Sequence, residues 1–162
     1  MIVIIMGTTG SGKTTIGQLL AAQLGWKFAD ADDFHSPENV AKMSRAVPLD
    51  DADRAAWLDA LRAIIVQWIA ESQNALMACS ALKASYREHL RVSPEVRFIY
   101  LKGSYETIAQ RILERKHRYM PKELLASQFA ALEEPGDDAI TVDIEPPPET
   151  IAAQVRQRLG LV

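Results

Sequence analysis

The chain has 162 residues and a formal net charge of −3, with 48% hydrophobic and 24% charged residues; this fits one globular domain and excludes a disordered chain. The slightly acidic balance gives no electrostatic footprint for nucleic acid, so a small molecule is the expected partner. Cys79 is the only cysteine, which excludes an intrachain disulfide and fits a reducing, cytoplasmic setting, and no apolar stretch approaches the roughly 20 residues that span a membrane.

Short apolar strands alternate with helical segments along the chain. We expect strands near residues 2–6, 26–30, 75–79, 96–101 and 140–144, each followed by helical periodicity. This alternation predicts an α/β fold with a five-stranded parallel sheet covered by helices on both faces. Ligands of such sheets bind at the carboxyl ends of the strands. Residues 1–162 are therefore expected to form a single domain with its site at that edge.

The first glycine-rich segment, GTTGSGKT at residues 7–14, matches the complete P-loop pattern. It follows an apolar strand and opens a helix, so successive backbone N–H groups and the helix amino terminus would face phosphate oxygens. Lys13 is expected to reach the β- and γ-phosphates and to act in catalysis, and the Thr14 hydroxyl to ligate Mg²⁺. The predicted ATP-binding residues of this loop are Gly7, Thr8, Thr9, Gly10, Ser11, Gly12, Lys13, Thr14 and Thr15. The alternative is a glycine-rich turn without a ligand.

Two carboxylates follow the second predicted strand. Many P-loop proteins hold Mg²⁺ with an aspartate at a strand end, but Cys79 and Ser80 end the third strand here. In FADADDFH, residues 28–35, extended backbone would place Asp30 and Asp32 on one face. Both would point toward the phosphates if this strand lies beside the P-loop strand. We expect Asp30 on the metal side and Asp32 as general base and substrate ligand; the alternative is a solvated turn.

The longest helix is predicted over about residues 51–72, because apolar residues recur there at spacings of three and four. The stripe consists of Trp57, Leu58, Leu61, Ile64, Ile65 and Trp68. Its two tryptophans are expected in the core rather than as a ligand platform. Ser36, Ser80 and Ser104 are expected helix N-caps, and Pro148 is expected near the first position of the last helix.

A P-loop alone does not separate kinases from other nucleotide-hydrolysing proteins. The chain has neither the Asn-Lys-x-Asp segment of guanine recognition nor the LSGGQ signature of ABC-type ATPases, and it is short for a motor. A kinase that acts on a small molecule or a nucleotide is the class that remains.

Five further segments beyond the P-loop have a distinctive pattern. They are DADDFHSPENVAKM at 30–43, PLDDADRAAWL at 48–58, CSALKASYR at 79–87, FIYLKG at 98–103 and SQFAALEEPG at 127–136. Together they resemble the gluconokinases. These segments cover nearly the whole chain in the expected order. Shikimate kinases share the P-loop and the paired aspartates but have a glycine-rich turn in place of Cys-Ser-Ala-Leu-Lys. The resemblance implies a P-loop fold like that of shikimate and nucleoside monophosphate kinases, with a small lid.

The resemblance also implies an activity, which is ATP-dependent phosphorylation of D-gluconate at its 6-hydroxyl with Mg²⁺. The product, 6-phosphogluconate, would feed the pentose phosphate pathway, and a homodimer is suggested. A polyhydroxy carboxylate needs hydrogen-bonding partners and cations. The predicted substrate ligands are Asp32, His35, Arg54, Lys83 and Arg87. Arg54, also predicted to be catalytic, and Arg87 are favoured for the carboxylate because arginine can form two parallel bonds to it. Each of the basic residues could instead be a solvated helix residue, and Asp51 and Asp53 are expected to cap the helix that presents Arg54.

A lid is predicted within residues 110–124, QRILERKHRYMPKEL, where one helix ends and another begins through Pro121. Residues 115–121 would close over ATP and exclude water. Arg111 and Arg115 lie four apart, on one predicted helical face, and could reach the nucleotide. The alternative is a solvated basic helix end favoured by the helix dipole.

The chain departs from the gluconokinase pattern at three places. His117, Arg118 and Tyr119 stand where Gly-His-Phe is common, and Ala46 and Ala56 replace a frequent glycine and proline. These changes concern the geometry of the predicted lid and the affinity for nucleotide, and they lie outside the predicted transfer centre.

Two alternatives to gluconate phosphorylation remain open. One is phosphorylation of another sugar acid or polyol, because neighbouring substrates differ by a single stereocentre. The other is a nucleotide-binding regulatory module with a decayed transfer site, against which the intact Lys13, Thr14, Asp30 and Asp32 argue.

Overall fold

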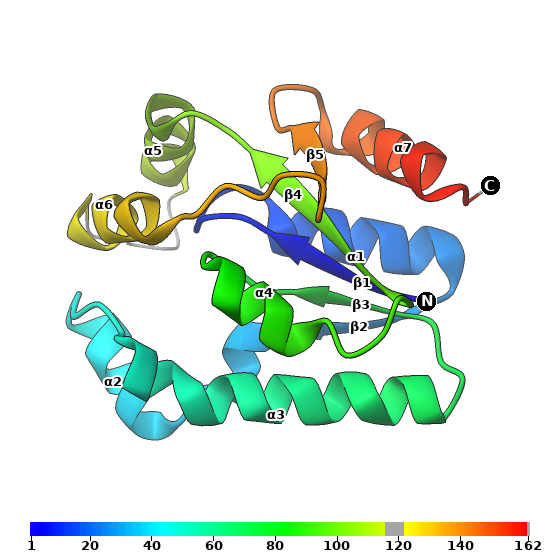
Figure 1. Ribbon diagram of the computed structural model, residues 1–162. Coiled ribbons are helices and arrows are strands. Elements are labelled where there is room, and N and C mark those ends of the chain that lie inside the picture. Colours follow the sequence, from blue (N-terminus) through cyan, green and yellow to red (C-terminus); the bar gives the residue numbers. More distant parts are fainter. Residues whose placement is uncertain (116–121, 162) are drawn as a thin grey trace.

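The computed structural model describes residues 1–115 and 122–161. Within them, five parallel strands form one sheet in the order β2-β3-β1-β4-β5 (Figure 1). The strands are β1 (Ile2–Met6), β2 (Lys27–Asp30), β3 (Ala75–Ala78), β4 (Val96–Lys102) and β5 (Ile140–Asp143). The helices are α1 (Lys13–Leu24), α2 (Pro37–Ser44), α3 (Asp51–Ala70), α4 (Ala84–Leu90), α5 (Tyr105–Glu114), α6 (Lys122–Ala131) and α7 (Pro148–Leu159), and the 3₁₀ turn η1 (Ala31–Phe34) follows β2. The predicted parallel α/β sheet is confirmed.

The P-loop strand β1 lies at the centre of the sheet. All five of its side chains are completely buried, as its unbroken apolar run requires when helices cover both faces. Ile4 pairs with Met77 of β3 on one side and with Phe98 of β4 on the other. The condition stated for Asp30 and Asp32, that β2 lies beside β1, is not met, because β3 separates the two strands. The P-loop therefore leaves the middle of the sheet, two strands away from Asp30.

Two apolar cores hold the helices onto the two faces of the sheet. Side chains of β1 alternate between the cores, with Ile4 in the first and Val3 in the second. The first core lies under α3 and α4 and includes both tryptophans of the predicted stripe. The second lies under α1 and α7, which flank each other on the opposite face (Figure 1). The expected core position of Trp57 and Trp68 is confirmed.

Most predicted helix starts are confirmed. Ser36 and Ser104 cap α2 and α5 by accepting backbone N–H groups, and Pro148 is the first residue of α7. The cap of α3 is Asp50 rather than Asp51, and it forms a reciprocal capping box with Asp53.

The predicted N-cap at Ser80 is wrong, because the next helix begins only at Ala84. Ala81 is completely buried and has a left-handed backbone with φ 45°, which interrupts any helix at that point. The segment from Ser80 to Lys83 instead runs irregularly along the carboxyl edge of the sheet. It is therefore placed beside the P-loop, where Ser80 accepts the N–H of Gly7 at 3.3 Å.

The turn that ends α2 carries backbone strain at Ala46. The N–H groups of Ala46 and Val47 bond to Met43 and Lys42, a C-terminal motif that normally has glycine at the left-handed position, and Ala46 has φ 59°. We expect Ala46→Gly to stabilise the protein by about 1 kcal/mol, because glycine adopts this backbone without steric penalty.

Chemical denaturation of the Ala46→Gly protein checks this expectation, and Ala56→Gly is the matched control. Ala56 lies inside α3, where the same change is expected to destabilise by roughly 1 kcal/mol. Equal losses of stability in both variants would contradict the strain at Ala46.

No helix in the described part of the chain combines the length and apolar character needed to cross a membrane.

Candidate active site

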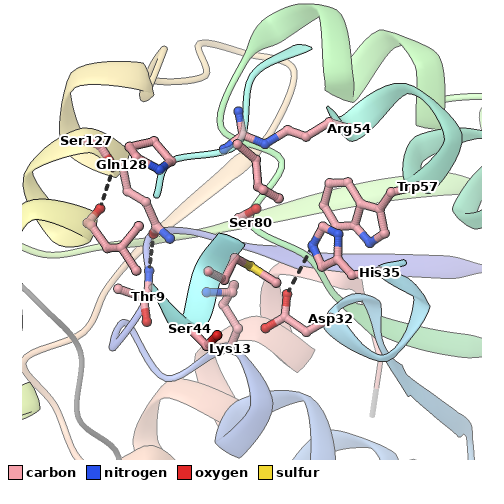
Figure 2. Close-up of a pocket in the computed structure, with 14 residues that line it drawn as sticks. Thr9, Lys13, Asp32, His35, Ser44, Arg54, Trp57, Ser80, Ser127 and Gln128 are labelled. Atoms are coloured by element: carbon pink, nitrogen blue, oxygen red, sulfur yellow. Dashed lines mark hydrogen bonds and ion pairs between the residues drawn. The ribbon is translucent and has the colours of Figure 1, made fainter. Parts of the chain in front are cut away.

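A cavity of about 210 Å³ opens at the carboxyl edge of the sheet. Its walls come from the P-loop, the segment after β2, the α2–α3 region and α6 (Figure 2). The polar and charged lining residues are Thr9, Lys13, Asp32, His35, Ser44, Arg54, Ser80, Ser127 and Gln128. The three residues predicted to be catalytic, Lys13, Asp32 and Arg54, therefore face the same space.

The P-loop, residues 7–14, has the geometry of a phosphate cradle. Gly10 has φ 76°, and a Cβ there would lie 2.8 Å from the Ile112 side chain, so only glycine fits. The hydroxyls of Thr8 and Ser11 are buried and have no hydrogen-bond partner among the described residues. Buried donors in a curled loop at a helix amino terminus are suited to phosphate oxygens. The residues present thus fit the phosphates of ATP.

Lys13 is the first residue of α1 and lies within this cradle. Its Nζ donates to the carbonyl oxygen of Thr8 at 2.9 Å. Burial lowers the pKa of the ammonium, and the Asp32 carboxylate acts in the opposite direction. An anionic ligand stabilises a buried cation of this kind. The neighbouring Thr15, also predicted to bind ATP, has an exposed side chain.

Thr14 and Asp30 come together although they belong to different elements. The Thr14 hydroxyl donates to Asp30 Oδ2 at 2.9 Å, so a hydroxyl and a carboxylate face each other at the start of α1. Oxygen donors of this type are the ligands that Mg²⁺ prefers, and the ion usually takes only one or two from protein and the others from phosphates and water. Among the described residues there is no group of three metal-binding side chains. The pair therefore fits a magnesium ion held jointly with a nucleotide.

Asp32 reaches the cavity by a route that differs from the prediction. The chain turns directly after Asp30, whose carboxylate accepts the N–H of Asp32 at 3.0 Å and caps η1. The prediction that both aspartates share one face of an extended strand is therefore wrong. The Asp32 side chain is 78% exposed and open to a substrate. Nearby protein still withdraws water from the carboxylate and raises its pKa, while Lys13 opposes that rise.

His35 is fixed against the wall of the cavity. Its ring stacks on Trp57 with centroids 4.3 Å apart, and Nδ1 lies 3.4 Å from the amide nitrogen of Asn39. Burial lowers the pKa of the imidazole, which favours the neutral ring. With Asn39 donating to Nδ1, the ring proton sits on Nε2, which lies 4.0 Å from Asp32 Oδ1. Trp57 thus packs in the first core and also lines the cavity.

Arg54 lies in the first turns of α3 and lines the cavity. Its Nη1 donates to the hydroxyl of Tyr86 at 3.1 Å, and that hydroxyl donates to Asp51. Lys83 Nζ pairs with the same Asp51 carboxylate at 2.9 Å. Lys83 therefore stands behind Arg54 and outside the cavity lining, in contrast to its predicted contact with substrate. Sequence reasoning missed Tyr86, although it lies in the matched segment at 79–87.

Arg87 has a structural position instead of the predicted one at the substrate. Its side chain is 3% exposed, and its guanidinium donates to the carbonyl oxygens of Ala81, Leu82 and Glu133 and to Asp138. These contacts tie α4 to the segment after α6. Since its side chain is buried among these acceptors and does not line the cavity, the predicted role as a carboxylate ligand is corrected.

The predicted nucleotide-binding arginines differ in their placement. Arg111, on α5, donates to the carbonyl oxygen of Ile144 at 2.6 Å. Arg115 follows the end of α5 with an extended backbone, so the two do not share one helical face as predicted. Its positive charge nevertheless contributes to lowering the pKa of Lys13. Residues 116–121, with the predicted lid and the departure at His117, Arg118 and Tyr119, lie outside the described residues.

Helix α6 supplies functional residues that sequence reasoning did not assign. Gln128 Oε1 accepts the backbone N–H of Thr9 at 2.6 Å, so α6 bonds directly to the P-loop. The segment at 127–136 was recognised as part of the resemblance, but no chemistry was attached to it. Its position after the predicted lid was the available signal.

Comparisons with known proteins agree with this geometry. The sequence matches the family described as shikimate kinase over residues 9–158. The thermosensitive gluconokinase of Escherichia coli (strain K12) is 43% identical, over 95% of this chain and 84% of that protein. A sugar kinase structure from Janibacter sp. HTCC2649 superposes with a TM-score of 0.93 at 41% identity, covering 99% of this chain and 95% of that one. A gluconokinase structure from Sinorhizobium meliloti 1021 has a TM-score of 0.84 at 35% identity, covering 98% and 94%.

Proposed function

Because this chain belongs to the shikimate kinase family, and within it to the gluconokinases, we propose that it transfers the γ-phosphoryl group of ATP to the 6-hydroxyl of D-gluconate. The products are 6-phospho-D-gluconate and ADP. The observation that carries the proposal is the convergence of Lys13, Asp32 and Arg54 on one cavity beside the P-loop. Residues 1–162 act as one kinase domain.

The P-loop binds the phosphates of ATP in this mechanism. Backbone N–H groups and the hydroxyls of Thr8 and Ser11 surround the phosphate oxygens, and Lys13 contacts the β- and γ-phosphates. Thr14 and Asp30 would hold Mg²⁺, which would supply positive charge to offset the negative charge of the phosphates. The role of the chain is to hold the γ-phosphoryl in line with the acceptor and to stabilise its charge.

Asp32 accepts the proton of the 6-hydroxyl as that oxygen attacks phosphorus. Its carboxylate is open to the cavity, and its raised pKa makes it a stronger base than an ordinary aspartate. The Nε2 atom of His35 lies 4.0 Å from the same carboxylate, on the wall of the same cavity. The new oxygen–phosphorus bond forms as the bond from the γ-phosphorus to ADP breaks, and the proton leaves with Asp32.

Arg54, on α3, binds the carboxylate of D-gluconate in the same cavity. Arginine suits a carboxylate because its planar donors can form two parallel bonds. Tyr86 and Asp51 act through Arg54 by fixing its guanidinium, and Lys83 completes this cluster through Asp51. With Arg54 and Asp32 on separate elements, one end of an extended acceptor is held while the other reaches the phosphoryl group.

The proposal is tested by following ADP release with Mg-ATP and a panel of D-gluconate, other aldonates, shikimate and common sugars. We expect turnover that depends on D-gluconate. Strong turnover on a different acid would support the phosphoryl-transfer mechanism but contradict D-gluconate as the acceptor. Nucleotide binding without turnover on any acceptor would favour the regulatory module instead.

We further propose that the enzyme works in the cytoplasm as a homodimer. The single cysteine supports a reducing setting, since the chain can form no intrachain disulfide. Light scattering of the purified protein measures the oligomeric state, and a monomer at working concentration would contradict the dimer.

A further inference from the structure

The contact between Gln128 and the P-loop joins two parts of the chain 119 residues apart in sequence. Both Thr9 and Gln128 line the cavity (Figure 2). A backbone N–H is a donor only, so the group of Gln128 that meets it must be the carboxamide oxygen. This contact fixes which end of the amide faces the loop and leaves the other end for a ligand.

The amide nitrogen of Gln128 has two N–H donors of its own. No acceptor within residues 1–115 and 122–161 pairs with them, whereas the oxygen is held at 2.6 Å. The nitrogen shares the cavity with Lys13 and Asp32. Since Lys13 of a P-loop reaches the β- and γ-phosphates, the unused donors share the cavity in which the transferring phosphoryl group would sit.

The attachment of α6 to the protein does not depend on Gln128. Leu124 and Leu125 are buried beneath the helix, with 7% and 2% exposure, and provide its apolar anchor. The neighbouring Ser127 also lines the cavity, but its hydroxyl donates back to the Leu124 carbonyl oxygen at 2.9 Å. The two adjacent polar residues of α6 thus differ. The hydroxyl of Ser127 has a hydrogen-bond partner within the helix, whereas the amide nitrogen of Gln128 has no acceptor among the described residues.

We propose that Gln128 is a γ-phosphate ligand, whose carboxamide oxygen holds the Thr9 N–H while its amide nitrogen donates to the γ-phosphoryl group of ATP. Gln128 then distinguishes ATP from ADP, since only ATP carries the group that it contacts. The same contact makes it a catalytic residue, because the donors remain on the phosphoryl oxygens during transfer. This inference rests on the proposed function only in requiring ATP at the P-loop.

The test is the affinity of the Gln128→Glu protein for ADP and for a non-hydrolysable ATP analogue, measured by titration calorimetry without acceptor. Glutamate keeps an oxygen for the Thr9 N–H but places a second, anionic oxygen against the γ-phosphoryl group. We expect affinity for the ATP analogue to fall roughly 10- to 100-fold, as for loss of a hydrogen bond to a charged group, and affinity for ADP to change by less than about threefold. Glu123→Gln is the matched control, because it exchanges the same two side chains at an exposed position of α6 outside the cavity lining, and both affinities should stay at wild-type values.

Equal weakening of both nucleotides, or no weakening, would overturn the inference. Gln128→Met provides a second variant of similar length that carries no charge, and it should show the same preferential loss of the ATP analogue. Thermal unfolding of each variant verifies that the fold is intact. Because no acceptor is present, this result is independent of the acceptor panel. A wild-type protein inactive on D-gluconate would refute the proposed function without touching the assignment of Gln128.

Discussion

The Asp32→Asn enzyme should turn over D-gluconate about 10²- to 10⁴-fold more slowly than the wild type, the usual contribution of a general base. Asparagine keeps the shape of the side chain but cannot take the proton of the attacking hydroxyl. Affinity for ATP should change little, because the P-loop binds the phosphates. Steady-state kinetics measure both quantities, and Asp33→Asn is the matched control, since Asp33 lies next to Asp32 in η1 and outside the cavity lining.

Asp32→Asn should also leave the folding stability at neutral pH unchanged or higher. Withdrawal of water by the surrounding protein raises the pKa of Asp32 above its ordinary value of 3.8, so the ionised carboxylate disfavours the folded state at neutral pH. Asp32→Asn should therefore be at least as stable as the wild type at pH 7. As the pH falls through the raised pKa toward 3.8, the wild-type carboxyl takes up its proton and this difference should disappear. Near wild-type turnover of Asp32→Asn would contradict the assignment of the base.

Lys13→Met is expected to lower kcat by at least about 10²- to 10³-fold, as for removal of one donor that stabilises transition-state charge. Burial already lowers the pKa of this ammonium, so an apolar side chain of similar length should leave the nucleotide-free fold intact. Stabilisation by added ATP should decrease, because a principal phosphate contact is lost.

Thermal unfolding with and without ATP, together with steady-state kinetics, measures both effects of Lys13→Met. Lys27→Met serves as control, because Lys27 is exposed at the start of β2 with a distant ion pair of 4.0 Å to Glu71. The Lys27→Met control should retain wild-type turnover. Wild-type turnover in Lys13→Met as well would contradict the assignment of the cavity beside the P-loop as the transfer centre.

Local sequence patterns predicted the elements of the fold well. Apolar runs and turn residues define each strand to within one residue, because strand formation at a buried position follows from the run itself. The P-loop motif likewise predicted that Lys13 faces the cavity, because the glycines of the motif determine the local backbone that presents this side chain. The order of the strands was not predictable in this way. The position of β3 between β1 and β2 depends on how helices distant in sequence pack on the sheet, and the sequence of a single segment does not determine this packing.

The functional roles of individual side chains were harder to predict than the elements that carry them. Arg54 and Arg87 have the same chemistry and lie in segments matched equally well, yet one lines the cavity and the other is buried among carbonyl oxygens. Burial of a guanidinium depends on tertiary contacts such as those with Glu133. Gln128 was missed for a related reason, because its partner Thr9 lies at the other end of the chain.

The position of the phosphate on the product gives the most direct test of transfer to the 6-hydroxyl of D-gluconate. The wild-type enzyme is incubated with Mg-ATP and D-gluconate, and the product is recorded by proton-coupled ³¹P NMR. A phosphate ester at the primary 6-hydroxyl couples to two protons and should give a triplet alongside the signals of ADP. A doublet, which reports a secondary hydroxyl with one proton, or ADP formation without any phosphorylated acid, would contradict it.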